Sequence, residues 1–177
     1  LFEEHMQMHI HAHRADDIFT AVRIAEEFGL DYCVVHCTQG HLIADRLAKA
    51  GVKAFSGPLI SDRCKPELKD STPATPGVLS KAGVKTAIVT DHPVIPIQYL
   101  PLCAGLAVRE GMTHDDALRA ITINPAEMCG IADRVCSLEV GKDADMSLFD
   151  SDPLTLFAKP LLVVGDGEIL MEGKPNA

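Results

Sequence analysis

Three histidines stand at alternate positions near the start of the chain, in the stretch MHIHAHRADD: His9, His11 and His13. Alternate side chains of a β-strand point to the same face of the sheet, so a strand in this stretch would direct a row of imidazoles to one place. Imidazole nitrogens bind zinc and transfer protons near neutral pH. The spacing therefore indicates a reactive or metal-binding site at this strand.

Two other polar groups follow apolar runs that are typical of buried strands: His36 comes directly after YCVV, and Asp91 comes after VKTAIVT. In parallel α/β folds the chemistry lies at the carboxyl ends of the strands, so we expect His11, His36 and Asp91 to converge. Imidazole and carboxylate without thiolate suit zinc, or another divalent ion such as manganese or iron. Asp91 is the candidate for both a metal ligand and the proton carrier of a metal-activated water.

Four further residues are weaker candidates for binding a small-molecule substrate. His13 shares the expected face of His11 and lies further out, and His92 follows Asp91. Arg14 and Arg63 lie in expected strand-end loops, where a guanidinium group can hold a carboxylate. A solvated surface charge is the simpler alternative for each arginine. A hydrogen-bonded core histidine is the alternative for each proposed histidine ligand.

The elements that must position these groups alternate along the first two-thirds of the chain. Apolar runs and helical spacing predict strands over residues 6–12, 32–35, 52–58 and 84–91, and helices over residues 15–28, 41–51, 75–83, 99–110 and 113–122. Such repeating units imply parallel strands with right-handed crossovers. Beyond Glu139 the chain turns to short strands, including a hairpin over 163–170 with a tight Asp-Gly turn.

Composition limits the partners and the compartment. The 177 residues are 47% hydrophobic and carry a net charge of −9, which argues against nucleic acid or an anionic membrane as a partner. No apolar run approaches the length of a membrane span. The six cysteines form no CxxC pair, so we expect a reducing, cytoplasmic location rather than a disulfide framework.

Several segments resemble one known family. HIHAHRADDI, VVHCTQG and IVTDHPV resemble the fifth, sixth and eighth strands of the metal-dependent amidohydrolase superfamily, most closely its imidazolonepropionase-like and prolidase-like members. NPAEMCGIADRVCSLEVGKDADMSLFD resembles the link into the β-sandwich domain of that superfamily. The resemblance implies an α/β fold, with strands five to eight of a (β/α)₈ TIM-type barrel in residues 1–124. Residues 125–177 would be the link and part of a small β-sandwich.

The same resemblance implies the chemistry. One or two divalent metal ions, with zinc as the first choice, would be held by His11, His36 and Asp91, and Asp91 would be the general base. The reaction would be hydrolysis of an amide or cyclic C–N bond, other than an ordinary peptide bond, by metal-activated water. The substrate would be a dipeptide-like amide, an N-acyl amino acid or an imidazolone-type ring.

The superfamily also carries a His-x-His pair in its first strand, and the histidines near residue 11 must be compared with that pair. A barrel of about 250 residues spends roughly 30 on each strand-helix unit. His36 and Asp91 are therefore too close for the first-strand assignment. We expect the chain to lack the first four strands and to meet either that missing half-barrel or a second copy of itself, as a homo-oligomer.

Two alternatives stay open. The chain could be a catalytically incomplete fragment that binds a metal and only folds or self-associates. It could instead be a phosphate-binding α/β protein without a metal, although it lacks the Gly-rich strand-to-helix loop that such a protein uses.

Overall fold

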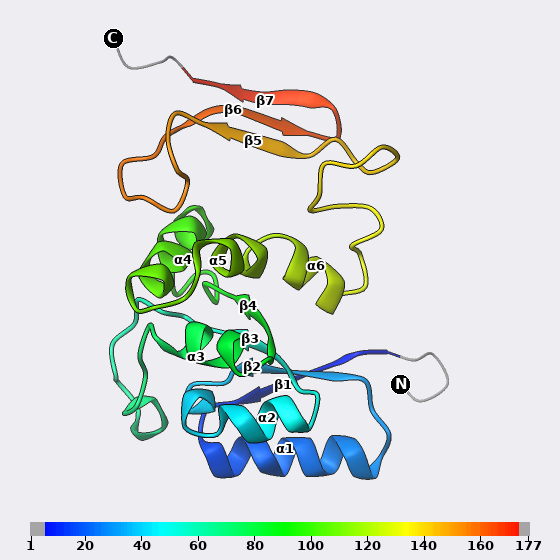
Figure 1. Ribbon diagram of the computed structural model, residues 1–177, viewed down its shortest axis with the longest axis vertical. Coiled ribbons are helices and arrows are strands. Elements are labelled where there is room, and N and C mark those ends of the chain that lie inside the picture. Colours follow the sequence, from blue (N-terminus) through cyan, green and yellow to red (C-terminus); the bar gives the residue numbers. More distant parts are fainter. Residues whose placement is uncertain (1–5, 174–177) are drawn as a thin grey trace.

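The computed structural model describes residues 6–173, which form two β-sheets and six α-helices (Figure 1). In chain order the strands and α-helices are β1 (Met8–Ala12), α1 (Ala15–Glu27), β2 (Tyr32–His36), α2 (Ala44–Lys49), β3 (Lys53–Ser56), α3 (Thr75–Lys81), β4 (Lys85–Ile88), α4 (Leu100–Arg109), α5 (His114–Ala120), α6 (Ile123–Met128), β5 (Met146–Phe149), β6 (Pro160–Gly165) and β7 (Glu168–Glu172). Short 3₁₀ helices occur at Gly40–Leu42 (η1), Pro66–Leu68 (η2) and Ile97–Tyr99 (η3). No helix in this range is long and apolar enough to cross a membrane.

The first sheet is parallel, with its four strands in the order β1-β2-β3-β4. This confirms the parallel βα arrangement that the alternating sequence pattern predicts. The register places Ala12 beside His36 and His36 beside Ser56, so the carboxyl ends of β1, β2 and β3 lie level. Groups that follow these strands therefore meet at one end of the sheet.

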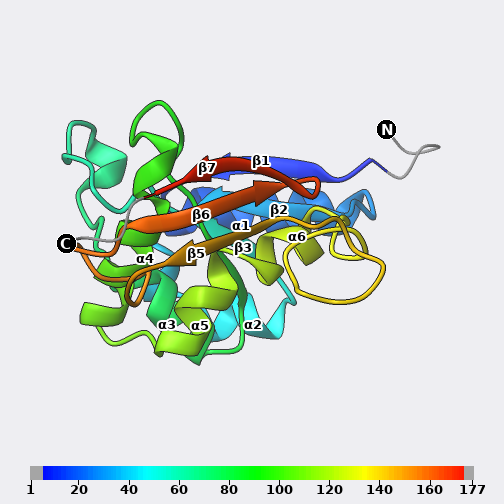
Figure 2. The ribbon, with the colours of Figure 1, turned by 90° about the horizontal axis from the view of Figure 1, so that it is seen from above.

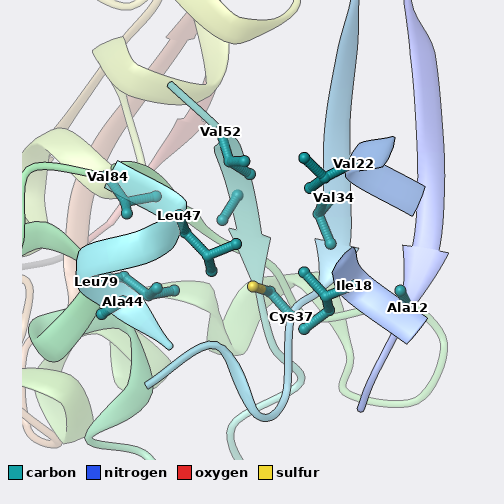
Figure 3. Packing of buried hydrophobic residues seen from close by; sticks show 11 residues of the cluster. Ala12, Ile18, Val22, Val34, Cys37, Ala44, Leu47, Val52, Leu79 and Val84 are labelled. Carbon is teal, nitrogen blue, oxygen red and sulfur yellow. The ribbon is translucent and has the colours of Figure 1, made fainter. Parts of the chain in front are cut away.

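The main core lies between this sheet and helices α1, α2 and α3 (Figure 3). Ile18 and Val22 of α1 are four residues apart, so both face the sheet and meet Val34 of β2. Leu47 of α2 and Leu79 of α3 are fully buried in the same cluster. Burying each such aliphatic side chain contributes about 1.5–3 kcal/mol, which fixes the helices on this face.

A second layer continues beyond β4, where α4 and α5 pack with the segment around Leu154. The backbones approach closely: a Cβ on Gly105 of α4 would lie 2.1 Å from the Leu154 carbonyl oxygen. Thr113 caps α5 by accepting a hydrogen bond from the Asp116 backbone N–H.

The second sheet is antiparallel, in the order β5-β6-β7, and lies at the far end of the molecule from α1 (Figures 1 and 2). Asp166 and Gly167 join β6 to β7 with φ values of 51° and 79°, which confirms the predicted tight turn. Three apolar residues of this sheet are exposed, with relative solvent accessibilities of 57% for Leu148, 65% for Ile169 and 67% for Leu170. The sheet therefore presents apolar surface to solvent.

Two parts of the chain differ from the prediction. The helix expected over 41–51 is divided into η1 and α2, because Ile43 between them has a non-helical φ of −134°. Helix α6 was not predicted, and the expected domain boundary between residues 124 and 125 falls inside it. Pro125 fits in the first turn of α6 because the N–H groups there have no helical partner. Asn124 Nδ2 donates to the Thr86 carbonyl oxygen at 2.9 Å and ties α6 to β4.

Candidate metal centre

Three imidazoles meet at the carboxyl end of the parallel sheet: those of His11, His13 and His36. One nitrogen from each lies within 4.8 Å of the others, and among residues 6–173 this is the one such group of three metal-ligating side chains. The Nε2 atoms of His11 and His13 are 2.8 Å apart, and the ring centroids of His11 and His36 are 4.3 Å apart. The cluster therefore presents several nitrogen donors to one point.

The strand geometry explains how two separate segments supply this cluster. His11 and His13 are two residues apart at the end of β1, so they share a face. His36 stands beside Ala12 in the register, and regular alternation would send its side chain toward the helices with Ala12. Positive φ values of 70° at His36 and 49° at Cys37 interrupt the regular strand conformation there. The His36 ring consequently contacts His11 and His13, while Cys37 enters the core.

Hydrogen bonds fix two of the rings. His36 Nδ1 lies 2.7 Å from the Gly57 carbonyl oxygen and must donate to it, because a carbonyl oxygen only accepts. His13 Nδ1 shares a hydrogen bond of 2.8 Å with the Thr38 hydroxyl. In both rings the other nitrogen, Nε2, is left for the cluster. Partners of this kind commonly orient histidines that bind metals.

Gly57 can hold its carbonyl toward His36 because it has no side chain. Its φ is +143°, a region that side-chain-bearing residues rarely adopt, and a Cβ would lie 2.1 Å from the Val89 carbonyl oxygen. The acceptor of His36 therefore depends on a glycine at this position.

The environment favours neutral imidazoles. Burial, followed by the neighbouring His36 and His11, lowers the pKa of His13 to about 4. Burial, followed by His36 and the charge of Lys65, also lowers the pKa of His11, although Asp91 acts in the opposite direction. Near pH 7 both rings are thus neutral, which is the form that binds metal ions.

A cavity of about 430 Å³ opens on the three histidines. Its walls come from the ends of β1 and β2, from parts of the segment 57–71, and from Asp91 and Val94. Asp91 lies outside the cluster of three nitrogens, three residues beyond β4, and has a positive φ of 52°. The cavity thus combines imidazole nitrogens with a carboxylate.

The structure brings four of the seven predicted site residues into this cavity: His11, His13, His36 and Asp91. The other three do not line it. Arg14 forms an ion pair of 2.9 Å with Asp16, Arg63 Nη2 donates to the Ser71 carbonyl oxygen at 2.8 Å, and His92 is exposed.

Sequence reasoning missed Thr38 and Gly57, which orient the rings. The Gly57-Pro58 pair at the end of a predicted strand could have indicated the role of Gly57. Nothing in the sequence marked Thr38, because its contact with His13 spans 25 residues.

Comparisons with known proteins agree on one family. The model of the Amidohydrolase family matches residues 2–167. The chain is 30% identical over 167 residues to "Amidohydrolase tasK" of Hapsidospora irregularis, covering 91% of this chain and 17% of that protein. It is 39% identical over 82 residues to the imidazolonepropionase of Shouchella clausii, covering 45% of this chain and 18% of that protein.

A solved structure is similar throughout the chain. The crystal structure of an amidohydrolase from Thermotoga maritima MSB8 superposes with a TM-score of 0.91 and 40% identity, covering 95% of this chain and 44% of that one. The chain thus spans less than half the length of this protein, and about a fifth of the two curated relatives. Because the family model matches nearly all of it, the chain belongs to the amidohydrolase family.

Proposed function

We propose that this chain carries part of the active site of a metal-dependent amidohydrolase, which hydrolyses an amide or cyclic C–N bond other than an ordinary peptide bond. The observation that carries the proposal is the meeting of three imidazoles and Asp91 at one cavity. The names of similar proteins support the bond type, since they include imidazolonepropionase and N-substituted formamide deformylase.

The residues present fit a divalent metal ion. His11, His13 and His36 offer ring nitrogens, and hydrogen bonds from His36 to Gly57 and between His13 and Thr38 leave Nε2 of both rings for an ion. We propose these three as ligands, with Asp91 beside them as a further ligand. Zinc, the expected ion, would lower the pKa of a water to roughly 7 and polarise the substrate carbonyl.

Asp91 would carry the proton in this reaction. Its carboxylate faces the same cavity as the histidines, so it can accept a proton from the attacking water and return it to the leaving nitrogen. The positive φ of Asp91 supports this role, because strained backbone conformations are concentrated at functional sites.

We further infer that β1 to β4 are strands five to eight of a TIM-type barrel, and that residues 125–177 contribute to a β-sandwich. The similarity to the Thermotoga maritima structure supports this inference, since the chain covers 44% of that protein. In the described part of the chain β1 and β4 are sheet edges, so we propose that further strands, from a longer chain or a second copy, pair with them.

Zinc binding by the purified chain tests the metal site. We expect about one equivalent of zinc by elemental mass spectrometry after dialysis. A His11→Gln, His36→Gln double variant should lose it. The control, His114→Gln, replaces a histidine outside the cluster and should keep it. If the unaltered chain bound no zinc, this result would contradict the proposal.

Hydrolysis of a panel of amides and cyclic amides by the zinc-loaded protein tests the reaction. Asp91→Asn should lower kcat by about 100-fold or more while zinc is retained, because proton transfer by a placed group contributes that much. Zinc binding without turnover of any substrate would favour the alternative of a metal-binding chain that is catalytically incomplete.

A further inference from the structure

The segment 57–71 between β3 and α3 forms much of the cavity wall that faces the histidines. Nine of its residues line the cavity: Gly57, Pro58, Ile60, Ser61, Asp62, Cys64, Lys65, Leu68 and Ser71. The histidines lie at the strand ends, so a ligand that reaches them would have this segment beside it.

Hydrogen bonds hold the segment against the ends of β1 and β2. Gln39 Nε2 donates to Asp70 at 2.7 Å, and Gln39 Oε1 accepts from the Ala15 backbone N–H at 2.8 Å. Arg63 Nη2 donates to the Ser71 carbonyl oxygen at 2.8 Å, which closes the segment on itself. These contacts give the wall a defined position relative to the histidines.

Lys65 is the one cationic side chain of this segment that lines the cavity. Lys69 is 4.0 Å from Asp70, and Arg63 is bonded within the segment, so neither faces the site. Within residues 6–173, no carboxylate lies within ion-pair distance of Lys65. Its ammonium group is available to a ligand.

Lys65 and the three histidines line the same cavity, so one ligand in that cavity can contact both. The cavity wall also includes the apolar side chains of Ile60 and Leu68 and the carboxylate of Asp62, whose Oδ1 accepts a hydrogen bond from the Arg63 backbone N–H at 2.7 Å. The cavity thus offers a reaction centre, apolar side chains and one cation, with Asp62 as a further charged group of its wall.

We propose that Lys65 binds a carboxylate on the substrate, so that the substrate is an amide or cyclic amide with an anionic group beyond its scissile C–N bond. This inference rests on the proposed function. It favours N-acyl amino acids, carboxyl-terminal dipeptide-like amides and ring amides with an acidic side chain over neutral amides. Lys65 is then a residue that determines specificity.

Two probes that differ only in charge test this proposal: succinic acid monohydroxamate and the corresponding carboxamide. The hydroxamate group of each binds zinc, and only the first carries a carboxylate. Calorimetric titration of the zinc-loaded chain at low salt should show about five-fold tighter binding of the acid, as a partly exposed ion pair provides. The preference should disappear in Lys65→Gln and remain in Lys65→Arg.

Lys69→Gln is the matched control, because it removes the same charge from the same segment outside the cavity, and it should keep the five-fold preference. Equal binding of the two probes to the unaltered chain, or a preference that survives in Lys65→Gln, overturns the role of Lys65 while the metal site stands. A chain that binds no zinc overturns the proposed function and the role of Lys65 with it. Zinc content is therefore measured first on every variant.

Discussion

At the scale of single residues, each imidazole of the cluster depends on a different neighbour. His36 donates to a backbone carbonyl, His13 is bonded to a buried hydroxyl, and His11 has the nitrogen of His13 beside it. A carbonyl acceptor fixes which nitrogen of His36 carries the hydrogen, so its role does not depend on which way a hydroxyl rotates. These contacts orient the three rings toward one another.

Burial of neutral His13 makes the stability of the metal-free protein depend on pH. Its folded pKa is about 4, against about 6.5 in the unfolded chain, so the unfolded state binds the extra proton between these values. We expect neutral His13 to contribute fully to the free energy of unfolding above pH 6.5. This contribution should be lost progressively as the pH falls toward 4. Urea denaturation with a chelator present measures this dependence.

His13→Gln should reduce the slope of unfolding free energy against pH between pH 7 and 5, by less than the limit of about 1.4 kcal/mol per pH unit for one proton. The control is His92→Gln, since His92 is exposed and lies outside the cluster. An unchanged slope in His13→Gln would contradict the view that the fold holds this ring neutral.

At the scale of elements, the site depends on how each strand ends. The β1 end follows regular alternation, which places His11 and His13 together. The β2 end departs from it through the positive φ of His36, and the β3 end supplies the Gly57 carbonyl. Three strand ends with different backbone conformations are therefore needed for one cluster.

Gly57→Ala should disrupt this arrangement. The new Cβ would meet the Val89 carbonyl oxygen, and the conformation at φ +143° is unfavourable for alanine. We expect a loss of about 2–3 kcal/mol in the free energy of unfolding, together with weaker zinc binding, because His36 loses its acceptor. Chemical denaturation and zinc titration measure the two effects.

Gly29→Ala is the control for backbone strain alone. Gly29 also has a positive φ, of 61°, but no neighbouring atom lies within 4 Å of the place that a Cβ would occupy. The substitution should cost about 1 kcal/mol and leave zinc binding unchanged. If Gly29→Ala and Gly57→Ala lost the same free energy of unfolding, the close approach to Val89 would be unimportant.

At the scale of the whole molecule, the parallel sheet with its helices is well buried, whereas the antiparallel sheet β5-β7 is not. Every residue of β7 is exposed, and apolar side chains are frequent on β5 and β7. Exposed apolar strands with a free edge tend to associate. We therefore propose that the isolated chain self-associates through this sheet.

Light scattering after size exclusion should give a molar mass above the 19.0 kDa of one chain. A Leu148→Lys, Ile169→Lys double variant should shift the protein toward 19.0 kDa, because it places charge on the exposed sheet. The control Val140→Lys changes an exposed residue outside the sheet and should leave the molar mass unchanged. A monodisperse monomer in the unaltered chain would contradict this proposal.

The sequence alone determined much of the fold and part of the site, because these depend on local patterns. The alternating histidines located β1, apolar runs located β2 to β4, helical spacing located α1, and the Asp-Gly turn located the β6-β7 hairpin. Strand ends also predicted that His11, His36 and Asp91 would come together, and all three line one cavity. Helix α6 escaped prediction because its six residues include a proline and show no clear period.

Only the tertiary structure decided how the site is built. The bond between His13 and Thr38 and the Gly57 acceptor of His36 join residues that are far apart in sequence. The positive φ of His36 and the place of Lys65 in the cavity wall also follow from no local pattern. It also showed that Arg14 and Arg63 are engaged elsewhere. Local patterns specify which face a residue prefers, but departures from regular strand conformation and long-range hydrogen bonds arise only when the strands are packed side by side.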